Sequence, residues 1–163
     1  MKHTILMRKE AFKFAAAHMT VFPDGTKEPL HGHNYQVALQ LVLRESSFEK
    51  MVPFQHWKDA LMALCMEWDH RVLVPANNPF FKKIRVTDEE TEFTVCGKRY
   101  VLPSDEVLLL PTDNLSTEAF SGEFCRRFVV MLEGKPGFEL AESIEIAVEE
   151  SPGTGASCRW ERG

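Results

Sequence analysis

Three histidines are spaced so that they could share one metal ion. His31 and His33 flank Gly32 at the entrance of a predicted strand over residues 35–43, and alternate residues of a strand point to the same side of a sheet. His18 ends the preceding β-type segment, and a hairpin-like return of the chain would bring it alongside. Three neutral imidazoles with one open coordination position are typical of catalytic zinc. The simpler alternative is a pair of surface histidines at a strand end.

Two carboxylates and a further histidine could move protons beside such a metal. Asp69 precedes His70 at the end of a predicted helix, and an aspartate can orient an imidazole and stabilise its protonated form. A histidine in that place is also favoured by the helix dipole alone. Glu28 lies three residues before His31, where it could act as a general base or be no more than a solvated loop carboxylate.

Glu150 is a candidate for binding a ligand. It shares one predicted strand face with Ile144, Ile146 and Val148, and a carboxylate among core residues is costly unless it pairs with donors. A ligand with two adjacent N–H groups, such as a 2-aminopyrimidinone ring, would match it with two hydrogen bonds. The simpler interpretation is that the strand ends in water at this residue.

The strands that must position these residues follow from hydrophobic periodicity. Alternation from Tyr35 predicts the strand over 35–43, and looser β-type patterns cover 4–17 and 143–150. Two short β-type runs over 91–102 predict a hairpin that turns at a Cys-Gly pair.

Two helices are predicted from apolar residues at three- and four-residue steps. The first covers about 54–68, and the second begins after Asn114 or Ser116 and stops at Gly134 and Pro136. The predicted buried stripe of the first is Phe54, Trp57, Leu61, Leu64, Cys65 and Trp68, and that of the second is Ala119, Phe120, Phe124, Phe128, Met131 and Leu132.

The order of these elements predicts an α+β fold, with an antiparallel sheet and two helices on one side. Because the sequence contains neither an internal repeat nor a linker, we expect residues 1–163 to form a single domain. The edges of such a sheet need cover, and oligomerisation is one way to provide it.

Composition excludes several classes of partner. The formal charge of −5 argues against a broad nucleic-acid interface. The apolar stretches are far shorter than the ~20 residues that span a bilayer. The N-terminus carries no secretory run, so we expect a cytoplasmic protein that binds neither nucleic acid nor membrane. The four cysteines form no C-x-x-C pair, which predicts free, mostly buried thiols.

Taken in chain order, the candidate residues resemble those of a known family. The segments concerned are His18 after three alanines, His31-Gly32-His33-Asn34-Tyr35, Asp69-His70, Ser116-Thr117-Glu118 and Glu150-Ser151. As a set they resemble the 6-pyruvoyl-tetrahydropterin synthase and 6-carboxytetrahydropterin synthase family, over nearly the whole chain.

The resemblance implies a tunnelling fold (T-fold), a four-stranded antiparallel sheet with two helices on one face, to which residues 91–102 would add an extra hairpin. Subunits of that fold form trimers, and two trimers stack into a homohexamer with active sites between subunits. The implied substrate is 7,8-dihydroneopterin triphosphate, and the implied cofactor is Zn²⁺.

Residue roles are also implied by the resemblance. The implied assignments are His18, His31 and His33 for zinc, Asp69 and His70 for proton relay, Glu150 for anchoring the pterin ring, and Ser116 and Thr117 for lining its pocket. Cations that could offset the acidic balance for a triphosphate are Lys13, Lys27, Lys98 and Arg99.

One departure from the family pattern bears on the product. The usual members carry a catalytic cysteine four or five residues before the H-G-H, whereas this chain has no cysteine between Met1 and Met51. Glu28 instead gives E-x-x-H-G-H, which resembles a glutamate-type branch associated with cleavage of the substrate side chain to 6-hydroxymethyl-7,8-dihydropterin. A carboxylate acting on a side-chain hydroxyl could trigger this retro-aldol-like scission.

Alternatives to this lyase activity stay open. Within the family they are 6-carboxytetrahydropterin synthase and 6-pyruvoyl-tetrahydropterin synthase activity, and outside enzymes they are a non-catalytic relative that binds pterin or zinc and a metal-stabilised oligomer. Two smaller departures remain. Pro53 suits a first helical position. The segment over residues 75–111 is longer than the corresponding segment of the smallest relatives and receives no role.

Overall fold

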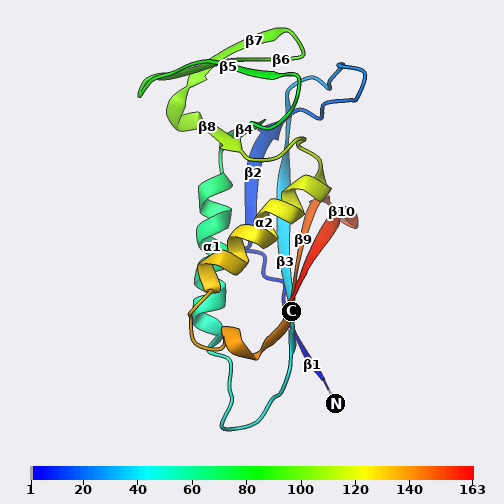
Figure 1. Cartoon of the computed structure of the whole chain (residues 1–163), viewed down its shortest axis with the longest axis vertical. Coiled ribbons are helices and arrows are strands. Elements are labelled where there is room, and N and C mark those ends of the chain that lie inside the picture. The colour runs from blue at the N-terminus through cyan, green and yellow to red at the C-terminus, as the bar shows by residue number, and fades with distance from the viewer. Residues whose placement is uncertain (1) are drawn as a thin grey trace.

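The computed structural model describes residues 2–163 and contains two α-helices and ten β-strands (Figure 1). In chain order these are β1 (His3–Met7), β2 (Lys13–His18), β3 (His31–Leu43), α1 (Phe54–Trp68), β4 (Arg71–Pro75), β5 (Phe81–Val86), β6 (Glu90–Val95), β7 (Lys98–Pro103), β8 (Val107–Leu110), α2 (Thr117–Leu132), β9 (Ala141–Ser151) and β10 (Thr154–Glu161). Two short 3-10 helices cover Ser104–Glu106 and Phe138–Leu140.

Seven strands form the main sheet, in the order β10-β9-β3-β2-β4-β8 with β1 also paired to β3. β10, β9, β3 and β2 are antiparallel neighbours, and they correspond to the four antiparallel strands that we expected. β1 pairs with the far half of β3, and β4 and β8 are parallel additions beyond β2. The α+β fold class is therefore confirmed, and the sheet is wider than predicted.

The alternation within β3 explains its place at the centre of the sheet. Tyr35, Val37, Leu39 and Leu41 are fully buried, whereas the residues between them are more exposed. Since β3 begins at His31 rather than four residues later, the histidine pair belongs to the same pleat as these core residues.

Both helices pack on the buried face of the sheet, in front of it in Figure 1. α1 has its predicted bounds. α2 begins at Thr117, and its N-cap Ser116 accepts a hydrogen bond from the backbone N–H of Ala119. Aromatic rings fill the space between the layers, since Phe14 of β2 stacks on Phe124 of α2 with ring centroids 6.0 Å apart.

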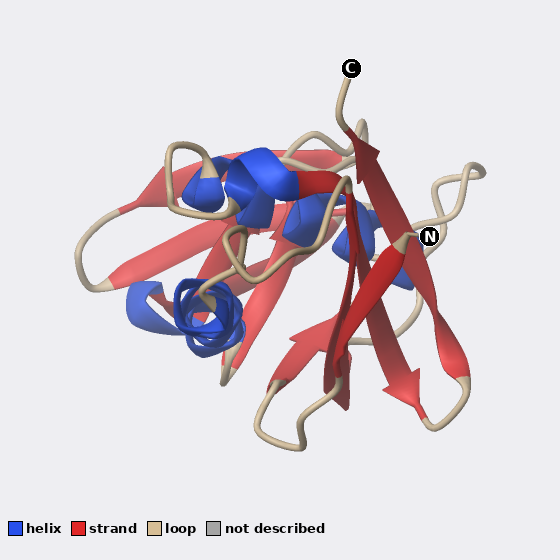
Figure 2. Ribbon diagram, turned by 90° about the horizontal axis from the view of Figure 1, so that it is seen from below, coloured by secondary structure: helices blue, strands red, loops and turns tan. Residues whose placement is uncertain are grey.

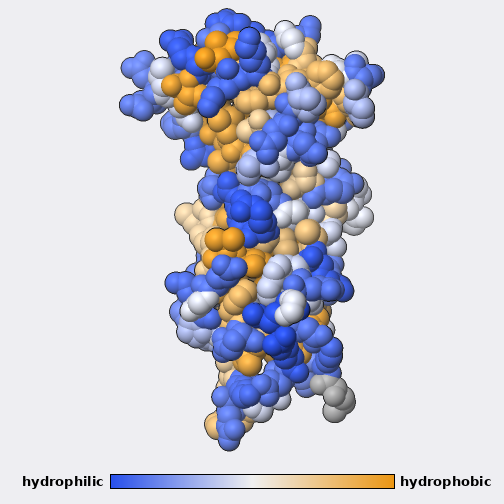
Figure 3. Space-filling model, in the orientation of Figure 1, coloured by the Kyte–Doolittle hydropathy of each residue, from blue (hydrophilic) through white to orange (hydrophobic). Residues whose placement is uncertain are grey.

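A second, three-stranded sheet of β5, β6 and β7 lies at the opposite end of the molecule from the chain termini (Figure 1). Figure 2 views the strands and helices from below, along the long axis of the molecule. The hydrophobic cluster of the second sheet contains Met19, Val21, Val74, Phe93 and Val95. The predicted hairpin is β6–β7, and β5 adds a strand that was not predicted. Apolar side chains are exposed in patches on this part of the surface (Figure 3).

Three details of the sequence analysis are wrong. Residues 4–17 form two strands, β1 and β2, with a turn between them. Pro53 is the N-cap of α1 because its ψ of 89° is not helical. Met131 and Phe54 were assigned to buried stripes but are 38% and 41% exposed. Phe54 is the first residue of α1, and Met131 is displaced from the line of buried residues that recur every four positions along α2, namely Phe120, Phe124, Phe128 and Leu132.

Neither α1 nor α2 combines the length and hydropathy of a membrane-spanning helix, and residues 2–163 offer no other candidate.

Candidate active site

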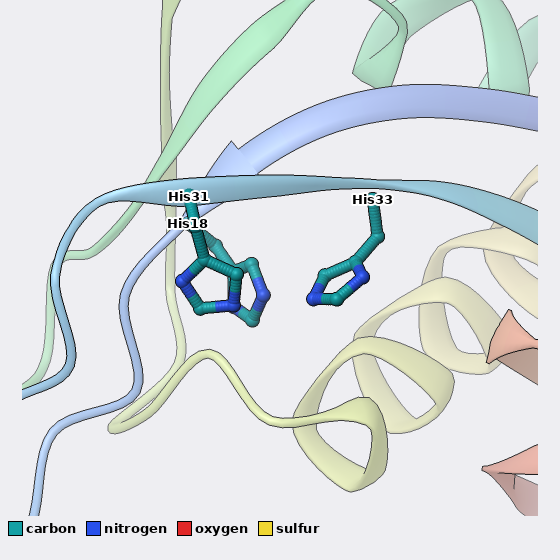
Figure 4. A group of neighbouring side chains, drawn as sticks. All are labelled: His18, His31 and His33. Atoms are coloured by element: carbon teal, nitrogen blue, oxygen red, sulfur yellow. The ribbon is translucent and has the colours of Figure 1, made fainter.

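Three imidazoles converge where β2 ends and β3 begins (Figure 4). In the antiparallel register His18 lies opposite His31, and Ala16 lies opposite His33, so the three side chains leave the same face of the sheet. One nitrogen of each ring lies within 4.8 Å of a nitrogen of each other ring. The register of two adjacent strands therefore brings together the three histidines that the sequence singled out.

Backbone carbonyl groups fix the protonation of two of these rings. Nδ1 of His18 lies 2.8 Å from the carbonyl oxygen of Leu115, and Nδ1 of His31 lies 2.9 Å from that of Pro29. Because a carbonyl oxygen only accepts, each Nδ1 carries the proton and donates it. The Nε2 lone pair of both rings is thereby left available to a metal.

The buried nitrogen of His18 supports the assignment of a metal site. Its Nε2 is buried and, among the described residues, has no hydrogen-bond partner, a costly state unless a ligand completes it. Burial lowers the pKa of His18 below its ordinary value, which favours the neutral form that binds metals. Three imidazole nitrogens that lie within 4.8 Å of one another fit Zn²⁺, the metal that the resemblance implies.

Asn114 holds the segment that contacts His18, a role that the sequence analysis did not find. Its Oδ1 accepts from the backbone N–H groups of Val21 and Leu115, and its Nδ2 donates to the Val21 carbonyl. The carbonyl that orients His18 is thus tied to the chain just beyond β2. The sequence analysis considered Asn114 only as a helix cap; its pairing with a residue 93 positions away gives no local signal.

Glu28 lies close enough to His18 and His31 to interact with them electrostatically. Its backbone N–H donates to the Thr20 carbonyl at 2.9 Å, and its Oε2 accepts from the Thr20 N–H at 3.4 Å. Hydrogen bonding from Thr20 holds the pKa of Glu28 below its ordinary value, and the two histidines act in the same direction. The carboxylate is therefore ionised near neutral pH, as a general base must be.

The predicted ligand-binding residues lie on the same face as the histidines. Glu150 follows Val148 by two residues in β9, and Val148 is buried opposite Val37 of β3. Burial raises the pKa of Tyr35, and the charge of Glu150 adds to this effect. Ser116 follows Leu115 and caps α2, whose first turn lies beside the imidazoles in Figure 4.

Asp69 and His70 form a hydrogen-bonded pair between the end of α1 and the start of β4. Nδ1 of His70 lies 2.9 Å from Oδ2 of Asp69, and Oδ1 of Asp69 accepts from the backbone N–H of Ala15 at 2.7 Å. His70 is exposed and borders a hollow of about 390 Å³. The hollow is also lined by Ala15, Ala17, Gly32 and Asn34. Ala16 and His33 border it as well. Because Ala15, Ala17, Gly32 and Asn34 alternate with the histidines along β2 and β3, the hollow lies mainly on the face opposite to the cluster.

The cysteines are free, as expected, and two of them, Cys65 and Cys125, are buried. Cys96 is half-buried, and its thiol lies 3.7 Å from the carbonyl oxygen of Thr26. Of the cations considered for a triphosphate, Lys13 pairs with Glu10, Arg99 pairs with Glu92, and Lys27 donates to the Glu28 carbonyl.

Comparison with known proteins places the chain in one family. The family model of 6-pyruvoyl tetrahydropterin synthase matches residues 7–161. The chain therefore belongs to the 6-pyruvoyl tetrahydropterin synthase family, as the resemblance implied, and it is a lyase of that family. The family acts on pterins, and the three-histidine cluster is a possible metal site.

Similar proteins agree with this membership. The chain is 30% identical over 149 residues to a putative 6-carboxy-5,6,7,8-tetrahydropterin synthase of Methanocaldococcus jannaschii, with 90% of this chain and 89% of that protein covered. The structure of 6-pyruvoyl tetrahydropterin synthase from Plasmodium vivax has a TM-score of 0.88 at 24% identity, and that from Plasmodium falciparum 0.86 at 23%, each covering 99% of both chains. Structures of two variants of the P. vivax protein also match, each with a TM-score of 0.88 at 23% identity and with 99% of both chains covered. These variants replace a glutamate that is described as a catalytic residue by alanine or by cysteine.

Proposed function

We propose that this lyase binds Zn²⁺ and cleaves the side chain of 7,8-dihydroneopterin triphosphate, with 6-hydroxymethyl-7,8-dihydropterin as product. One observation carries the proposal: the Glu28 carboxylate, which accepts a hydrogen bond from Thr20, lies within electrostatic range of His18 and His31 of the three-histidine cluster. The chain has no cysteine before Cys65, so this loop offers a carboxylate where a thiol would be needed for the usual family chemistry. The glutamate described as catalytic in the P. vivax protein supports the same assignment.

His18, His31 and His33 would hold the zinc ion, which supplies Lewis-acid polarisation of the substrate side-chain hydroxyls when bound. Glu28 would remove the proton from the second side-chain hydroxyl. The oxygen electron pair then forms a carbonyl as the carbon–carbon bond breaks, which releases a two-carbon aldehyde that carries the triphosphate. The carbon left on the ring gains a proton and becomes the hydroxymethyl group.

Glu150 would bind the pterin ring. Its carboxylate lies on the strand face that carries the histidines, and a carboxylate matches the adjacent ring N–H and amino groups with two parallel hydrogen bonds. Ser116 and Thr117, at the first turn of α2, would line the same pocket.

Asp69 and His70 would supply the proton that the carbon left on the ring gains, and they would do so in the site of a neighbouring subunit. His70 borders a hollow that lies mainly on the face opposite to the cluster, and the aspartate holds the histidine ring in a defined orientation. We therefore propose that the sites form between subunits of a homohexamer built from two trimers, so that the pair on one subunit meets the histidines of another.

A second candidate is 6-carboxytetrahydropterin synthase activity. The observation that favours it is the M. jannaschii relative, which carries that name at 30% identity over most of both chains. It would act at the same cluster, and it differs in leaving no hydroxymethyl product.

Product analysis distinguishes the two candidates. The purified protein, loaded with Zn²⁺, is incubated with 7,8-dihydroneopterin triphosphate, and the pterins are separated by chromatography and identified by mass. We expect 6-hydroxymethyl-7,8-dihydropterin as the main product. Carboxy- or pyruvoyl-tetrahydropterin without the hydroxymethyl product would reject the proposal.

A further inference from the structure

The three-stranded sheet contacts the chain segment that carries Glu28. We define the Glu28 loop as residues 19–30, between β2 and β3. The loop folds back on itself through an isolated bridge between Val21 and Lys27, and the Phe22 N–H donates to the Thr26 carbonyl at 2.8 Å. These internal bonds give the loop a shape, but they leave open what fixes it to the rest of the molecule.

Tyr100 of β7 is in contact with the lysine next to Glu28. Nζ of Lys27 lies 5.4 Å from the centroid of the Tyr100 ring, within the range of a cation–π interaction. The same Nζ donates to the backbone carbonyl of Glu28 at 3.0 Å. One ammonium group therefore joins the aromatic ring on the small sheet to the backbone of the candidate base.

The Tyr100 ring is itself held in place. It stacks on Phe93 of β6, with ring centroids 5.3 Å apart and planes 15° from parallel. Phe93 is fully buried in the cluster that also contains Met19 and Val21 of the Glu28 loop. The chain of contacts thus runs from a buried core through Tyr100 and Lys27 to Glu28.

Two further contacts join the small sheet to the tip of this loop. Gly25 has a φ of +81°, and a Cβ at this residue would lie 3.1 Å from the ring of Phe80. The Cys96 thiol lies 3.7 Å from the Thr26 carbonyl, and the Cys96 N–H donates to the Phe80 carbonyl at 3.1 Å. The loop tip is therefore packed against the sheet at successive residues.

We infer that Tyr100 is a positioning residue for Glu28, acting through Lys27, and that the three-stranded sheet serves to hold the catalytic loop in place. This inference rests on the proposed role of Glu28 as base. It assigns a function to part of the 75–111 segment, which received no role in the sequence analysis. Because a base acts only within hydrogen-bond reach of its proton, a loop that is freed from Tyr100 lowers turnover and leaves the metal ligands on β2 and β3 in place.

The test compares Tyr100→Leu, which removes the aromatic face, with Tyr100→Phe, which retains it. Lys27→Met removes the ammonium group and keeps the apolar stem, and Lys82→Met on the exposed side of β5 is the matched control for loss of a lysine. Each variant is measured for kcat, KM, bound zinc and the hydrogen-exchange rate of the Glu28 amide, which donates to Thr20 in the native loop.

We expect Tyr100→Leu and Lys27→Met to lower kcat about tenfold with zinc content unchanged, and we expect Tyr100→Leu, which keeps every candidate triphosphate cation, to leave KM unchanged as well. We expect the Glu28 amide to exchange faster by a similar factor in both. Combining the two substitutions should add little, because they interrupt the same link. Tyr100→Phe and Lys82→Met should match the wild type in turnover and exchange.

Wild-type exchange of the Glu28 amide in Tyr100→Leu and Lys27→Met would overturn the inference, as would equal losses in Tyr100→Phe and Tyr100→Leu. Should Tyr100→Leu fail to fold, Lys27→Met decides the question alone, because Lys27 is only half-buried and its replacement leaves the core intact. The exchange measurement needs no turnover. Absence of the hydroxymethyl product from the wild type would therefore refute the proposed function and leave the link between Tyr100 and the loop to be judged by exchange.

Discussion

Nδ1 of His18 and the carbonyl oxygen of Leu115 are 2.8 Å apart, and this hydrogen bond joins the end of β2 to the residue before the cap of α2. The orientation of a metal-binding ring therefore depends on a segment 97 residues away in the chain. A ligand that is held through its second nitrogen has a fixed tautomer and a fixed direction.

Asn114→Ala should weaken metal binding without touching a ligand. Its side chain ties Leu115 to Val21, so its loss leaves backbone groups unpaired at a cost of about 1–3 kcal/mol. We expect zinc affinity to fall about 10–100-fold, measured by competition with a chelator. Asn77→Ala, at an exposed asparagine, is the control and should have no effect. Unchanged affinity in Asn114→Ala would show that the Leu115 carbonyl is held by other means.

His33→Ala should abolish the stabilisation of the protein by zinc. Excess metal at about a thousandfold over its dissociation constant should raise the free energy of unfolding of the wild type by about 4 kcal/mol. Two remaining imidazoles cannot complete the site, so the variant should show little gain. Metal content by mass spectrometry and unfolding in urea measure both effects. Stoichiometric zinc in His33→Ala would place the metal elsewhere. His56→Ala, at an exposed histidine of α1, is the control.

Glu28→Gln should lower kcat about 10²–10⁴-fold, the usual contribution of a general base. The amide has nearly the shape of the carboxylate, so zinc content and pterin binding should persist, as measured by metal analysis and by calorimetry with a pterin. Glu49→Gln, an exposed glutamate after β3, should retain full activity. Normal turnover in Glu28→Gln would mean that a group other than Glu28 acts as the base.

Activity should reappear when two inactive variants are mixed. We expect Glu28→Gln and His70→Ala each to be inactive, because the site needs Glu28 from one subunit and His70 from the next. After joint refolding in equal amounts, about a quarter of the sites should contain both intact groups. Glu28→Gln mixed with His31→Ala is the control, since both lesions lie on the same side of the interface and no site should recover. Equal recovery in both mixtures, or in neither, would contradict the assignment to different subunits.

The stability of the fold should decline in acid partly through Glu123. This carboxylate is buried on α2, which alone would raise its pKa, but hydrogen bonds from Arg126 and Arg127 lower the pKa overall. A pKa below its ordinary value of 4.5 means that the stabilisation is complete above that pH and is lost as pH falls through the folded-state value.

Glu123→Gln should therefore reduce the free energy of unfolding at neutral pH by about 1–3 kcal/mol and should flatten its decline below pH 4.5. Urea unfolding from neutral to about pH 3 measures both. Glu133→Gln, an exposed glutamate at the end of α2, is the control. A steeper decline in Glu123→Gln than in the wild type would mean that the pKa of Glu123 is raised.

The elements with strong periodicity could be predicted from the sequence. α1 agrees with its predicted bounds, and β3 and β9 alternate as expected. β4 and β8 could not be found in this way, because parallel strands that are covered by other elements form short apolar runs without alternation. β10 contains glycine, serine and arginine, and it is a strand because β9 lies beside it.

The site was predictable where it depends on local geometry. The side shared by His31 and His33 follows from the period of a strand, and His18 joins them through a hairpin-like register. The place of Asp69 and His70 was not predictable. His70 has a φ of 56°, an unusual backbone state for a residue with a side chain, and the chain then enters β4 parallel to β2. Such a connection has no local sequence pattern.

The pleat of β3 also limits how the length of this protein can vary. His31 and His33 lie on one face of β3, and Gly32 and Asn34 lie on the other. One residue inserted or deleted between Gly32 and Leu43 would therefore move every residue on one side of the change to the opposite face of the sheet. The exposed part of the connection that follows, over 44–51, carries no such restriction. Insertions and deletions among descendants of this gene should therefore accumulate in that connection and be purged from the strand.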